Sequence, residues 1–178
     1  GRHTRLVRDW SSDVCSSDLP VRGGNSGTQM FGWFNKEINS LADLQGLKMR
    51  IPGLGGEVFR RAGGTPVTMQ ASEVFTALQT GALDAAEFVG PYNDLAAGYH
   101  TVADYYYYPG WHEPGSTLET LFNKSAMESL PVDLQEILYA GAEAMHQLLM
   151  DELTAKNNEA LRVLMAQHGV ECRNLPDA

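Results

Sequence analysis

From residue 20 onward, short apolar runs alternate with amphipathic stretches, and glycine or proline separates most of them. Each short run ends at a turn residue and is rich in β-branched, aromatic or other apolar side chains, which predicts a strand. We expect strands at 21–26, 29–34, 47–51, 65–69, 85–89, 105–108 and 117–122. Between them we expect a helical turn at 40–44 capped by Ser40, and helices at 57–62 and 93–99. A further helix, capped by Ser72, carries Val74, Phe75, Leu78 and Ala82 on one face. This alternation predicts an α/β fold.

The last third of the chain has a different pattern, because a helical period continues from about 131 to 168. One apolar stripe at helical spacing contains Leu134, Ile137, Leu138, Gly141, Met145, Leu148 and Leu149. At ~1.5 Å per residue, such a helix exceeds the diameter of a small domain. We therefore expect it to extend across more than one structural unit.

Residues 1–19 differ from everything that follows them. The segment has no apolar core and no small-residue cleavage pattern, so it is not a signal peptide. Its repeated Ser-Ser-Asp units have neither helical nor strand periodicity. The string resembles translated sequencing-adapter sequence, and the alternative is a disordered native tail. We expect a disordered, non-native tail over 1–19, which makes Cys15 non-native and leaves the true N-terminus and any export signal outside this sequence.

Composition narrows the classes of function. The 178 residues carry a net charge of -9, with 13 basic and 22 acidic side chains, so the surface repels phosphate backbones and nucleic-acid binding is excluded. No stretch approaches the ~18 unbroken apolar residues of a membrane span, so we expect no direct membrane insertion. The two cysteines, Cys15 and Cys172, have no metal-binding spacing and indicate no compartment.

Arg50 lies between apolar neighbours near the end of a predicted strand. Ligands of α/β sheets gather at strand carboxyl ends, and a guanidinium matches a carboxylate with two parallel donors. Local context favours the alternative, an ordinary surface arginine beside a strand. The glycines of 53–56 suggest a phosphate cradle, but Val58 occupies the position of the third glycine of GxGxxG, so a tight strand-to-helix turn is favoured.

Two acids, Glu87 and Glu113, stand in apolar or aromatic surroundings. They suit a catalytic acid and base, oxygen ligands for a hard cation, or charges that water or a nearby basic residue satisfies. Spacing does not choose among these. His112 beside Glu113 forms no metal signature, because HExxH needs a second histidine one turn later and Pro114 breaks any such helix.

Several strings, in this order, resemble the TRAP-transporter solute-binding proteins of the DctP family, and especially the TakP-like branch that binds 2-oxo acids and monocarboxylates. The strings are 23–30 (GGNSGTQM), 32–34 (GWF), 44–56 (LQGLKMRIPGLGG), 77–87 (ALQTGALDAAE), 89–94 (VGPYND) and 105–115 (YYYYPGWHEPG). The similarity extends over 20–178. It implies a periplasmic-binding-protein fold of two lobes joined by a long C-terminal helix. Residues 20–178 are then most of the second lobe with the returning part of the first lobe, whose N-terminal part is missing.

The resemblance also implies a site. Arg50 matches the arginine that binds the substrate carboxylate, and Gln29 matches a glutamine on the ligand side. A cation, Na⁺ or another hard ion, is expected beside the ligand, held by Gln29, Glu87, the main-chain carbonyl of Phe88 and Glu113. Glu113 and Phe88 also line the substrate pocket, and Asn93 and Trp111 are further wall residues. Relatives often carry tryptophan in place of Phe88, so the pocket wall here loses an indole donor and the size of the substrate is uncertain.

The resemblance implies a periplasmic protein that is not an enzyme and needs no catalytic cofactor. It captures a small carboxylate, a 2-oxo acid such as pyruvate, and passes it to the membrane permease of a sodium-coupled TRAP transporter, with a homodimer left open. One alternative is an enzyme that uses Glu87 and Glu113 on a small oxo acid. The other is a periplasmic sensor module on the same fold.

Overall fold

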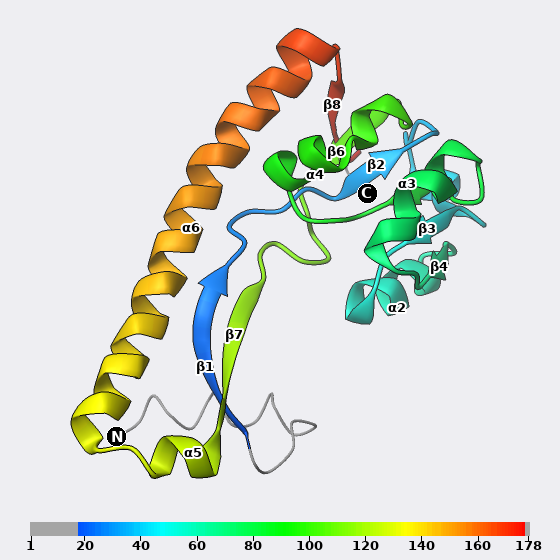
Figure 1. The fold of residues 1–178 in the computed structure, drawn as a ribbon. Coiled ribbons are helices and arrows are strands. Elements are labelled where there is room, and N and C mark those ends of the chain that lie inside the picture. Colours follow the sequence, from blue (N-terminus) through cyan, green and yellow to red (C-terminus); the bar gives the residue numbers. More distant parts are fainter. Residues whose placement is uncertain (1–17, 177–178) are drawn as a thin grey trace. The chain divides into compact units, whose positions relative to one another are not determined.

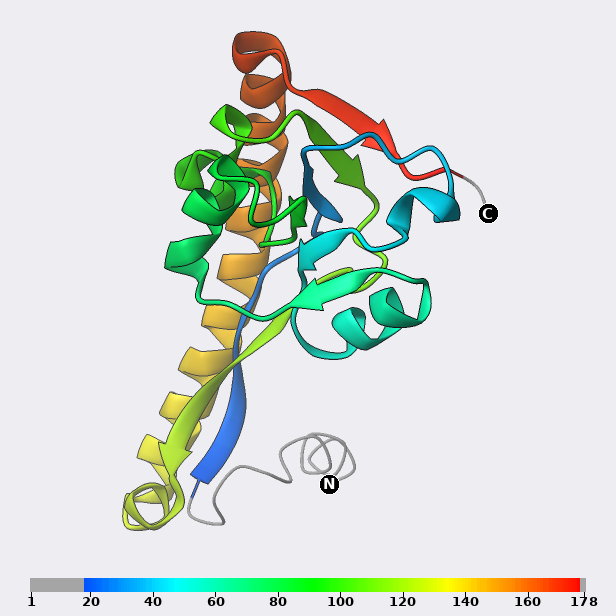
Figure 2. The same cartoon turned by 90° about the vertical axis from the view of Figure 1, so that its right-hand side faces the viewer.

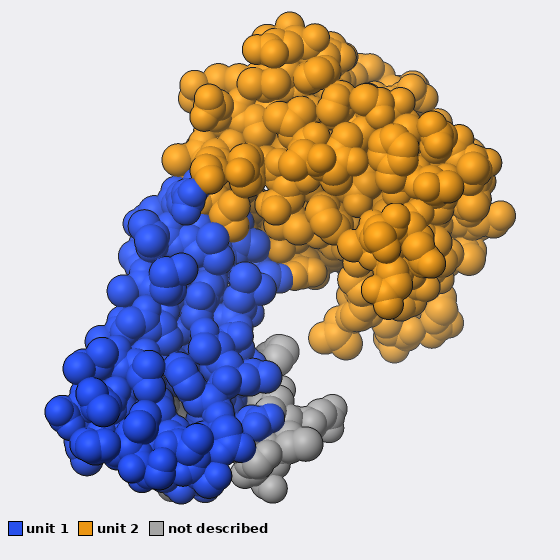
Figure 3. Space-filling view, in the orientation of Figure 1, with its two compact units in different colours: residues 1–26, 116–152 blue, residues 27–115, 153–178 orange. Residues whose placement is uncertain are grey.

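The computed structural model describes residues 18–176, and the chain divides into two compact units. Unit 1 comprises residues 1–26 and 116–152, and unit 2 comprises residues 27–115 and 153–178, as coloured in Figure 3. Most of the predicted tail, residues 1–17, lies outside the described residues. The last two residues of that predicted tail, Asp18 and Leu19, open the first strand.

Unit 1 is built on an antiparallel strand pair (Figure 1). Strand β1 (Asp18–Asn25) pairs with β7 (Thr117–Asn123), and the register shifts between Arg22 and Gly24. The unit also contains α5 (Lys124–Glu128) and the first part of α6 (Val132–His168). Buried His146 of α6 places Nδ1 2.8 Å from the carbonyl oxygen of Gly24, which ties the helix to β1.

Unit 2 contains a six-stranded mixed sheet with the order β4-β3-β5-β2-β6-β8. Its strands are β2 (Gly32–Phe34), β3 (Lys48–Arg50), β4 (Thr65–Val67), β5 (Ala85–Ala86), β6 (Tyr105–Tyr108) and β8 (Glu171–Asn174). Strand β3 runs parallel to both β4 and β5, and β6 runs parallel to β8. Strand β2 is antiparallel to β5 and β6 and so joins the two parallel groups.

The two faces of this sheet have separate cores, because successive residues of a strand point to opposite sides. Trp33 and Tyr106 belong to one core and their chain neighbours Phe34 and Tyr107 to the other. Helices α3 (Ala71–Gln79) and α4 (Pro91–Ala97), the 3-10 turn η2 (Tyr99–Thr101) and the end of α6 pack on the first face. Helix α2 (Gly53–Arg61) and the 3-10 turn η1 (Leu41–Leu44) pack on the second. Figure 2 shows α2 across the sheet from α3 and α4.

One buried carboxylate, Asp94, joins three elements of the first core. Its Oδ2 accepts hydrogen bonds from Trp33 Nε1 at 3.0 Å and from the hydroxyl of Tyr106 at 2.7 Å, and Oδ1 accepts one from the amide of Val89 at 3.3 Å. The Trp33 and Tyr106 rings stack with centroids 4.0 Å apart. Burial raises the pKa of Asp94 to about 6, and the three donors offset only part of that effect.

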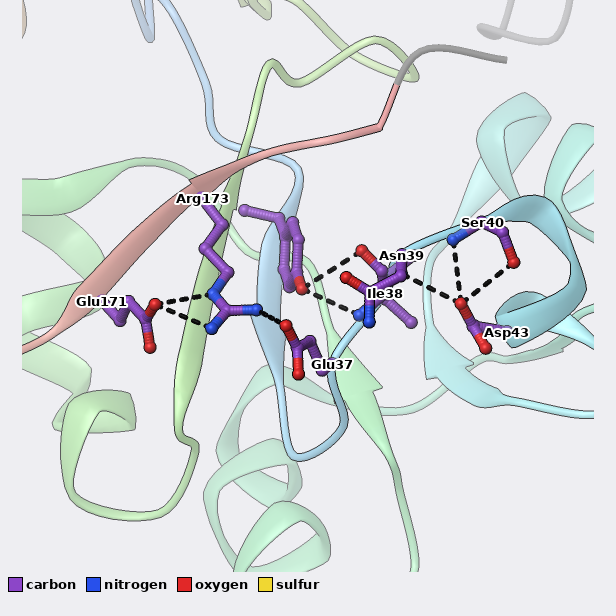
Figure 4. A network of polar contacts seen from close by, with 8 residues as sticks. Glu37, Ile38, Asn39, Ser40, Asp43, Glu171 and Arg173 are labelled. Atoms are coloured by element: carbon purple, nitrogen blue, oxygen red, sulfur yellow. Dashed lines mark hydrogen bonds and ion pairs between the residues drawn. The ribbon is translucent and has the colours of Figure 1, made fainter.

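Polar contacts secure the C-terminal strand β8 at the edge of the sheet (Figure 4). Arg173 pairs with Glu171 on its own strand and with Glu37, which follows β2. Its guanidinium also lies over the ring of Tyr105, 4.6 Å from the centroid. Beside this group, the amide of Ile38 donates to the hydroxyl of Tyr107 at 2.8 Å. These contacts hold the 35–40 loop against the strands.

The predicted alternation of strands and helices is confirmed, with errors at particular places. Helix α2 starts at Gly53 rather than at 57, and α3 has Gln70 as its N-cap, so Ser72 lies inside that helix. Sequence analysis missed α5 and β8. In α6 the apolar stripe is largely exposed, and the buried positions are Ala142, His146, Asn157, Ala160 and Leu164.

Gly32 offers a test of the sheet geometry. Its φ is +140°, and a Cβ there would lie 2.4 Å from the carbonyl oxygen of Ala86 on the neighbouring strand. We expect Gly32→Ala to lower the free energy of unfolding by about 1–3 kcal/mol, measured by urea denaturation. Gly141→Ala is the control, because nothing lies within 4 Å of its Cβ on the exposed side of α6. It should raise stability by up to about 1 kcal/mol. Equal effects of the two changes would contradict this account.

Asp94 predicts a pH dependence of stability. The folded state holds the proton up to about pH 6, whereas the ordinary pKa is 3.8. The stability that the bound proton provides is therefore complete below pH 3.8 and is lost as the pH rises through about 6. Relative to Asp94→Asn, the free energy of unfolding of the natural protein should fall by ~3 kcal/mol over that range. Urea denaturation at a series of pH values measures the difference, and parallel profiles for the two proteins would refute it.

Candidate ligand and cation site

Arg50 is the last residue of β3, at the carboxyl end of the strand, between buried Met49 and Ile51. Parallel pairing sets Arg50 opposite Ala86 of β5, and the amide of Glu87 donates to the carbonyl oxygen of Arg50 at 3.0 Å. The backbone ladder therefore places the Arg50 side chain beside the residue that follows β5. Nη1 donates to the main-chain oxygen of Glu87 at 3.0 Å and also pairs with its side-chain Oε1.

The Glu87 carboxylate is almost fully buried, with 2% of the side chain exposed. Each of its oxygens has a partner: Oε1 is paired with Arg50, and Oε2 lies 3.1 Å from His112 Nε2. We assign the donor hydrogen of His112 to Nε2, because the carboxylate oxygen is an acceptor. A buried carboxylate without such partners would carry a desolvation cost of several kcal/mol. The ion pair and the imidazole thus make a buried negative charge tolerable here.

Besides Arg50 of β3 and Glu87 after β5, the site includes the loop after β6, which brings Glu113 close to Glu87. Ligand atoms of Glu87, His112 and Glu113 all lie within 4.8 Å of one another. Gln29 is buried beside this loop, and its main-chain N–H donates to the carbonyl oxygen of Pro114 at 3.3 Å. The predicted cation ligands Gln29, Glu87 and Glu113 therefore come from three segments that the sheet brings together.

The glycines of 53–56 allow close packing beside the same site. A Cβ on Gly55 would lie 3.0 Å from Cβ of His112, and one on Gly56 would lie 2.6 Å from the carbonyl oxygen of Ile51. The start of α2 therefore lies close to His112 of the β6–β7 loop because Gly55 lacks a side chain, and the turn after β3 closes tightly because Gly56 lacks one. This supports the tight strand-to-helix turn over the phosphate cradle.

The donor set determines which ions suit the site. Two carboxylates offer the oxygen ligands that a hard cation prefers, and the imidazole adds a nitrogen. Arg50 supplies a positive charge to this group through its pair with Glu87. Through its guanidinium, Arg50 can in addition bind a carboxylate of a ligand. The residues present fit both a cation and a small acid.

The other predicted residues take different positions. The Phe88 ring packs edge-on against Tyr99 at 5.4 Å, and the chain at Val89 is held by Asp94. Asn93 lies on α4, and its Oδ1 is buried without a hydrogen-bond partner among residues 18–176. Trp111 lies outside the cluster of acids. It lines an apolar pocket of about 310 Å³, together with Phe31, Ile38, Ser40, Leu41, Leu44, Val58, Ala62, Leu175 and Pro176.

Sequence analysis passed over two residues that the site depends on. It set His112 aside because no metal motif surrounds it, and its contact with Glu87, 25 positions away, depends on the course of a loop. Asp94 has no signal in the sequence, because its partners Trp33 and Tyr106 are distant in the chain.

Within residues 18–176, no helix is long and apolar enough to cross a membrane, and α6 is no exception.

Comparisons with known proteins agree on one family. The family model of bacterial extracellular solute-binding protein, family 7 (DctP) matches residues 19–178. A monocarboxylate 2-oxoacid-binding periplasmic protein of Nostoc is 48% identical over 143 residues, which cover 80% of this chain and 39% of the relative.

Two solved structures have the same fold. A TRAP periplasmic solute-binding protein from Pseudoalteromonas atlantica, with bound sodium and pyruvate, superposes with a TM-score of 0.86 at 41% identity, over 96% of this chain and 51% of that one. A TRAP transporter solute-binding protein from Bordetella bronchiseptica has a TM-score of 0.87 at 37% identity, over 96% and 50%. That protein is a dimer with copurified calcium and picolinate in its occupied site.

The chain spans about half the length of these two solved structures. Its match to the Nostoc relative covers less than half of that protein's length. The relatives are solute-binding proteins of transporters and not enzymes, as the resemblance implied. The match over nearly all of the chain shows that it belongs to the DctP family of bacterial extracellular solute-binding proteins.

Proposed function

We propose that this chain binds a small carboxylate, a 2-oxo acid such as pyruvate, together with a hard cation, as part of a periplasmic solute-binding protein. The observation that carries the proposal is the position of Arg50, at a strand carboxyl end and in contact with a buried acid cluster. Pyruvate with sodium in the Pseudoalteromonas relative, and calcium in the Bordetella relative, support this assignment.

The anchor of the proposed ligand is the Arg50 guanidinium. Its hydrogen bonds to the described residues use Nη1, which leaves Nη2 and Nε as the proposed donors to a ligand. Glu87 fixes the side chain from one side, which lowers the entropy lost when the guanidinium binds a carboxylate. A charge-assisted hydrogen bond of this kind contributes about 1.5–3 kcal/mol net.

The cation belongs between the acids and the ligand. Glu87, Glu113, Gln29 and the main-chain oxygen of Phe88 are the proposed ligands, of which Glu87 and Glu113 lie together with His112. An ion there offsets the acids and attracts the carboxylate and keto oxygens of a 2-oxo acid. Phe88, Asn93 and Trp111 remain proposed wall residues.

The proposal extends to the whole transporter. The chain would supply most of the second lobe and the returning part of the first lobe, in line with its coverage of about half of the solved relatives. The complete protein would deliver its ligand to the membrane permease of a sodium-coupled TRAP transporter. A homodimer, as in the Bordetella relative, is part of the proposal, and light scattering of the purified protein tests it.

The enzyme alternative is not retained. Both oxygens of Glu87 have partners in Arg50 and His112, which suits an orienting or ion-binding acid better than a free general base. The relatives are solute-binding proteins. A sensor module would use the same site, and no feature of residues 18–176 favours it over transport.

The test of this proposal is the removal of the anchor in the protein produced from the complete gene. Arg50→Ala should abolish stabilisation by pyruvate, and Arg50→Lys, which keeps the charge but not the fork, should weaken binding by about 10-fold or more. Thermal unfolding with pyruvate, 2-hydroxy acids and dicarboxylates, with sodium or calcium present, gives the measurement. The natural protein should gain about 2.7 kcal/mol at 100 times Kd.

Arg60→Ala is the matched control for that series. Arg60 forms an exposed ion pair with Glu57 on α2, away from the acid cluster, so its loss should leave pyruvate binding unchanged. Unaltered affinity in Arg50→Ala, or an equal loss in both variants, would exclude Arg50 as the anchor.

A further inference from the structure

Tyr99 is a buried tyrosine whose hydroxyl has no hydrogen-bond partner among the described residues. The two other buried tyrosines are paired. The hydroxyl of Tyr106 donates to Asp94 at 2.7 Å. The hydroxyl of Tyr107 accepts from the amide of Ile38 at 2.8 Å. Buried phenol groups usually find such a partner, so the hydroxyl of Tyr99 is placed for a partner outside the described residues.

The wall residue Phe88 connects Tyr99 to the proposed ligand site. Tyr99 is the first residue of η2 and follows Gly98, whose φ of +77° ends α4 and turns the chain. The Tyr99 ring packs edge-on against the Phe88 ring, with the centroids 5.4 Å apart. Since Phe88 directly follows Glu87, Tyr99 contacts the neighbour of the acid that pairs with Arg50.

The hydroxyl of Tyr99 is accessible although the residue as a whole is only 2% exposed. Nδ1 of His112 is an unpaired side-chain atom that is closed off from solvent, and the hydroxyl oxygen of Tyr99 is not such an atom. A small polar group can therefore reach this oxygen, whereas the ring stays fixed by its packing.

The charges of the proposed site act on this hydroxyl. Burial raises the pKa of Tyr99 to about 12, so the group keeps its proton and can donate a hydrogen bond at neutral pH. The negative charges of Asp94 and Glu87 act in the same direction, and the positive charge of Arg50 opposes them. Because Coulomb interactions weaken with distance, these effects agree with a hydroxyl near the pair of Arg50 and Glu87.

We propose that Tyr99 is a ligand-binding residue, whose hydroxyl donates a hydrogen bond to the oxygen at the 2-position of the bound acid. This inference rests on the proposed function and adds a residue that distinguishes a 2-oxo acid from a plain carboxylic acid. Arg50 is the proposed anchor of the carboxylate, so the keto oxygen is the remaining acceptor of a molecule as small as pyruvate. A carbonyl oxygen has two lone pairs and can accept from Tyr99 while it contacts a cation. Packing against Phe88 already orders the ring, which lowers the entropy lost on binding.

The test removes the hydroxyl and keeps the ring, in the protein produced from the complete gene. Tyr99→Phe should weaken pyruvate binding by about 3- to 10-fold in calorimetry, which is the net effect of one lost hydrogen bond. Propionate lacks the keto oxygen, so its affinity, measured by competition with pyruvate, should be the same for the natural protein and the variant. Without ligand, the variant should unfold at no lower temperature, because its hydroxyl has no partner among the described residues.

Tyr107→Phe is the matched control, because the hydroxyl of Tyr107 accepts from the amide of Ile38 in the core on the other face of the sheet. This change should lower the unfolding temperature, since a buried amide loses its acceptor, and should leave the ratio of pyruvate to propionate affinity unchanged. Tyr99→Met also lacks the hydroxyl and has a flexible side chain that fills irregular space, so it tests the same ratio if the phenylalanine variant does not fold.

The ratio of the two affinities decides the role of Tyr99. A lower ratio in the Tyr99 variants, with an unchanged ratio in Tyr107→Phe, supports the inference. Pyruvate binding by Tyr99→Phe that is as tight as in the natural protein overturns it and leaves the proposed function intact. An equal loss of affinity for both acids also overturns it, because Tyr99 would then act only through the packing of Phe88. Binding of neither acid by the natural protein overturns the proposed function as well.

Discussion

The contact between Arg50 and Glu87 is the interaction on which the site depends. A carboxylate as buried as that of Glu87 needs compensating partners, and the structure supplies Arg50 on one oxygen and His112 on the other. In turn, Glu87 holds the guanidinium at the end of β3. The parallel register of β3 and β5 makes this pairing possible, because it puts the residue after β5 next to the last residue of β3. The register of the sheet therefore places the Glu87 carboxylate, and this carboxylate in turn positions the Arg50 guanidinium.

Asp94 is a second buried acid, and its hydrogen-bond partners differ from those of Glu87. Asp94 is as buried as Glu87, but its partners are the neutral donors of Trp33, Tyr106 and Val89. Neutral donors offset burial incompletely, so the pKa of Asp94 rises to about 6. Glu87 instead has a guanidinium beside it. Asp94 thus joins β2, β6 and the start of α4, whereas Glu87 pairs with Arg50 and lies close to His112 and Glu113.

Much of this arrangement could be predicted from the sequence, for identifiable reasons. Short apolar runs bounded by turn residues gave most strands, and Ser40 was the correct cap of η1. Boundaries failed at the helix starts: α2 begins at Gly53 within the glycine run, and α3 is capped by Gln70, which forms a capping box with Glu73, rather than by Ser72. The apolar stripe predicted along α6 is largely exposed, because a helical period identifies an apolar face but not which residues cover that face. Arg50 and the two acids were candidates from their local context, and only the resemblance chose among their possible roles, which stay predictions. The contacts of His112 depend on a loop that no periodicity describes.

The charges of the candidate site all lie within unit 2, between residues 29 and 113. Under the proposed function, different residues therefore select the ligand by its charge and by its size. Recognition of an acid depends on Arg50, Glu87 and Glu113, which one sheet and its loops position. Recognition of size depends on wall residues such as Phe88, which packs against Tyr99 and whose exchange leaves a main-chain carbonyl ligand unchanged. Charge selection and size selection can therefore change separately, since a substitution in the wall need not disturb the ion pair that orients the anchor.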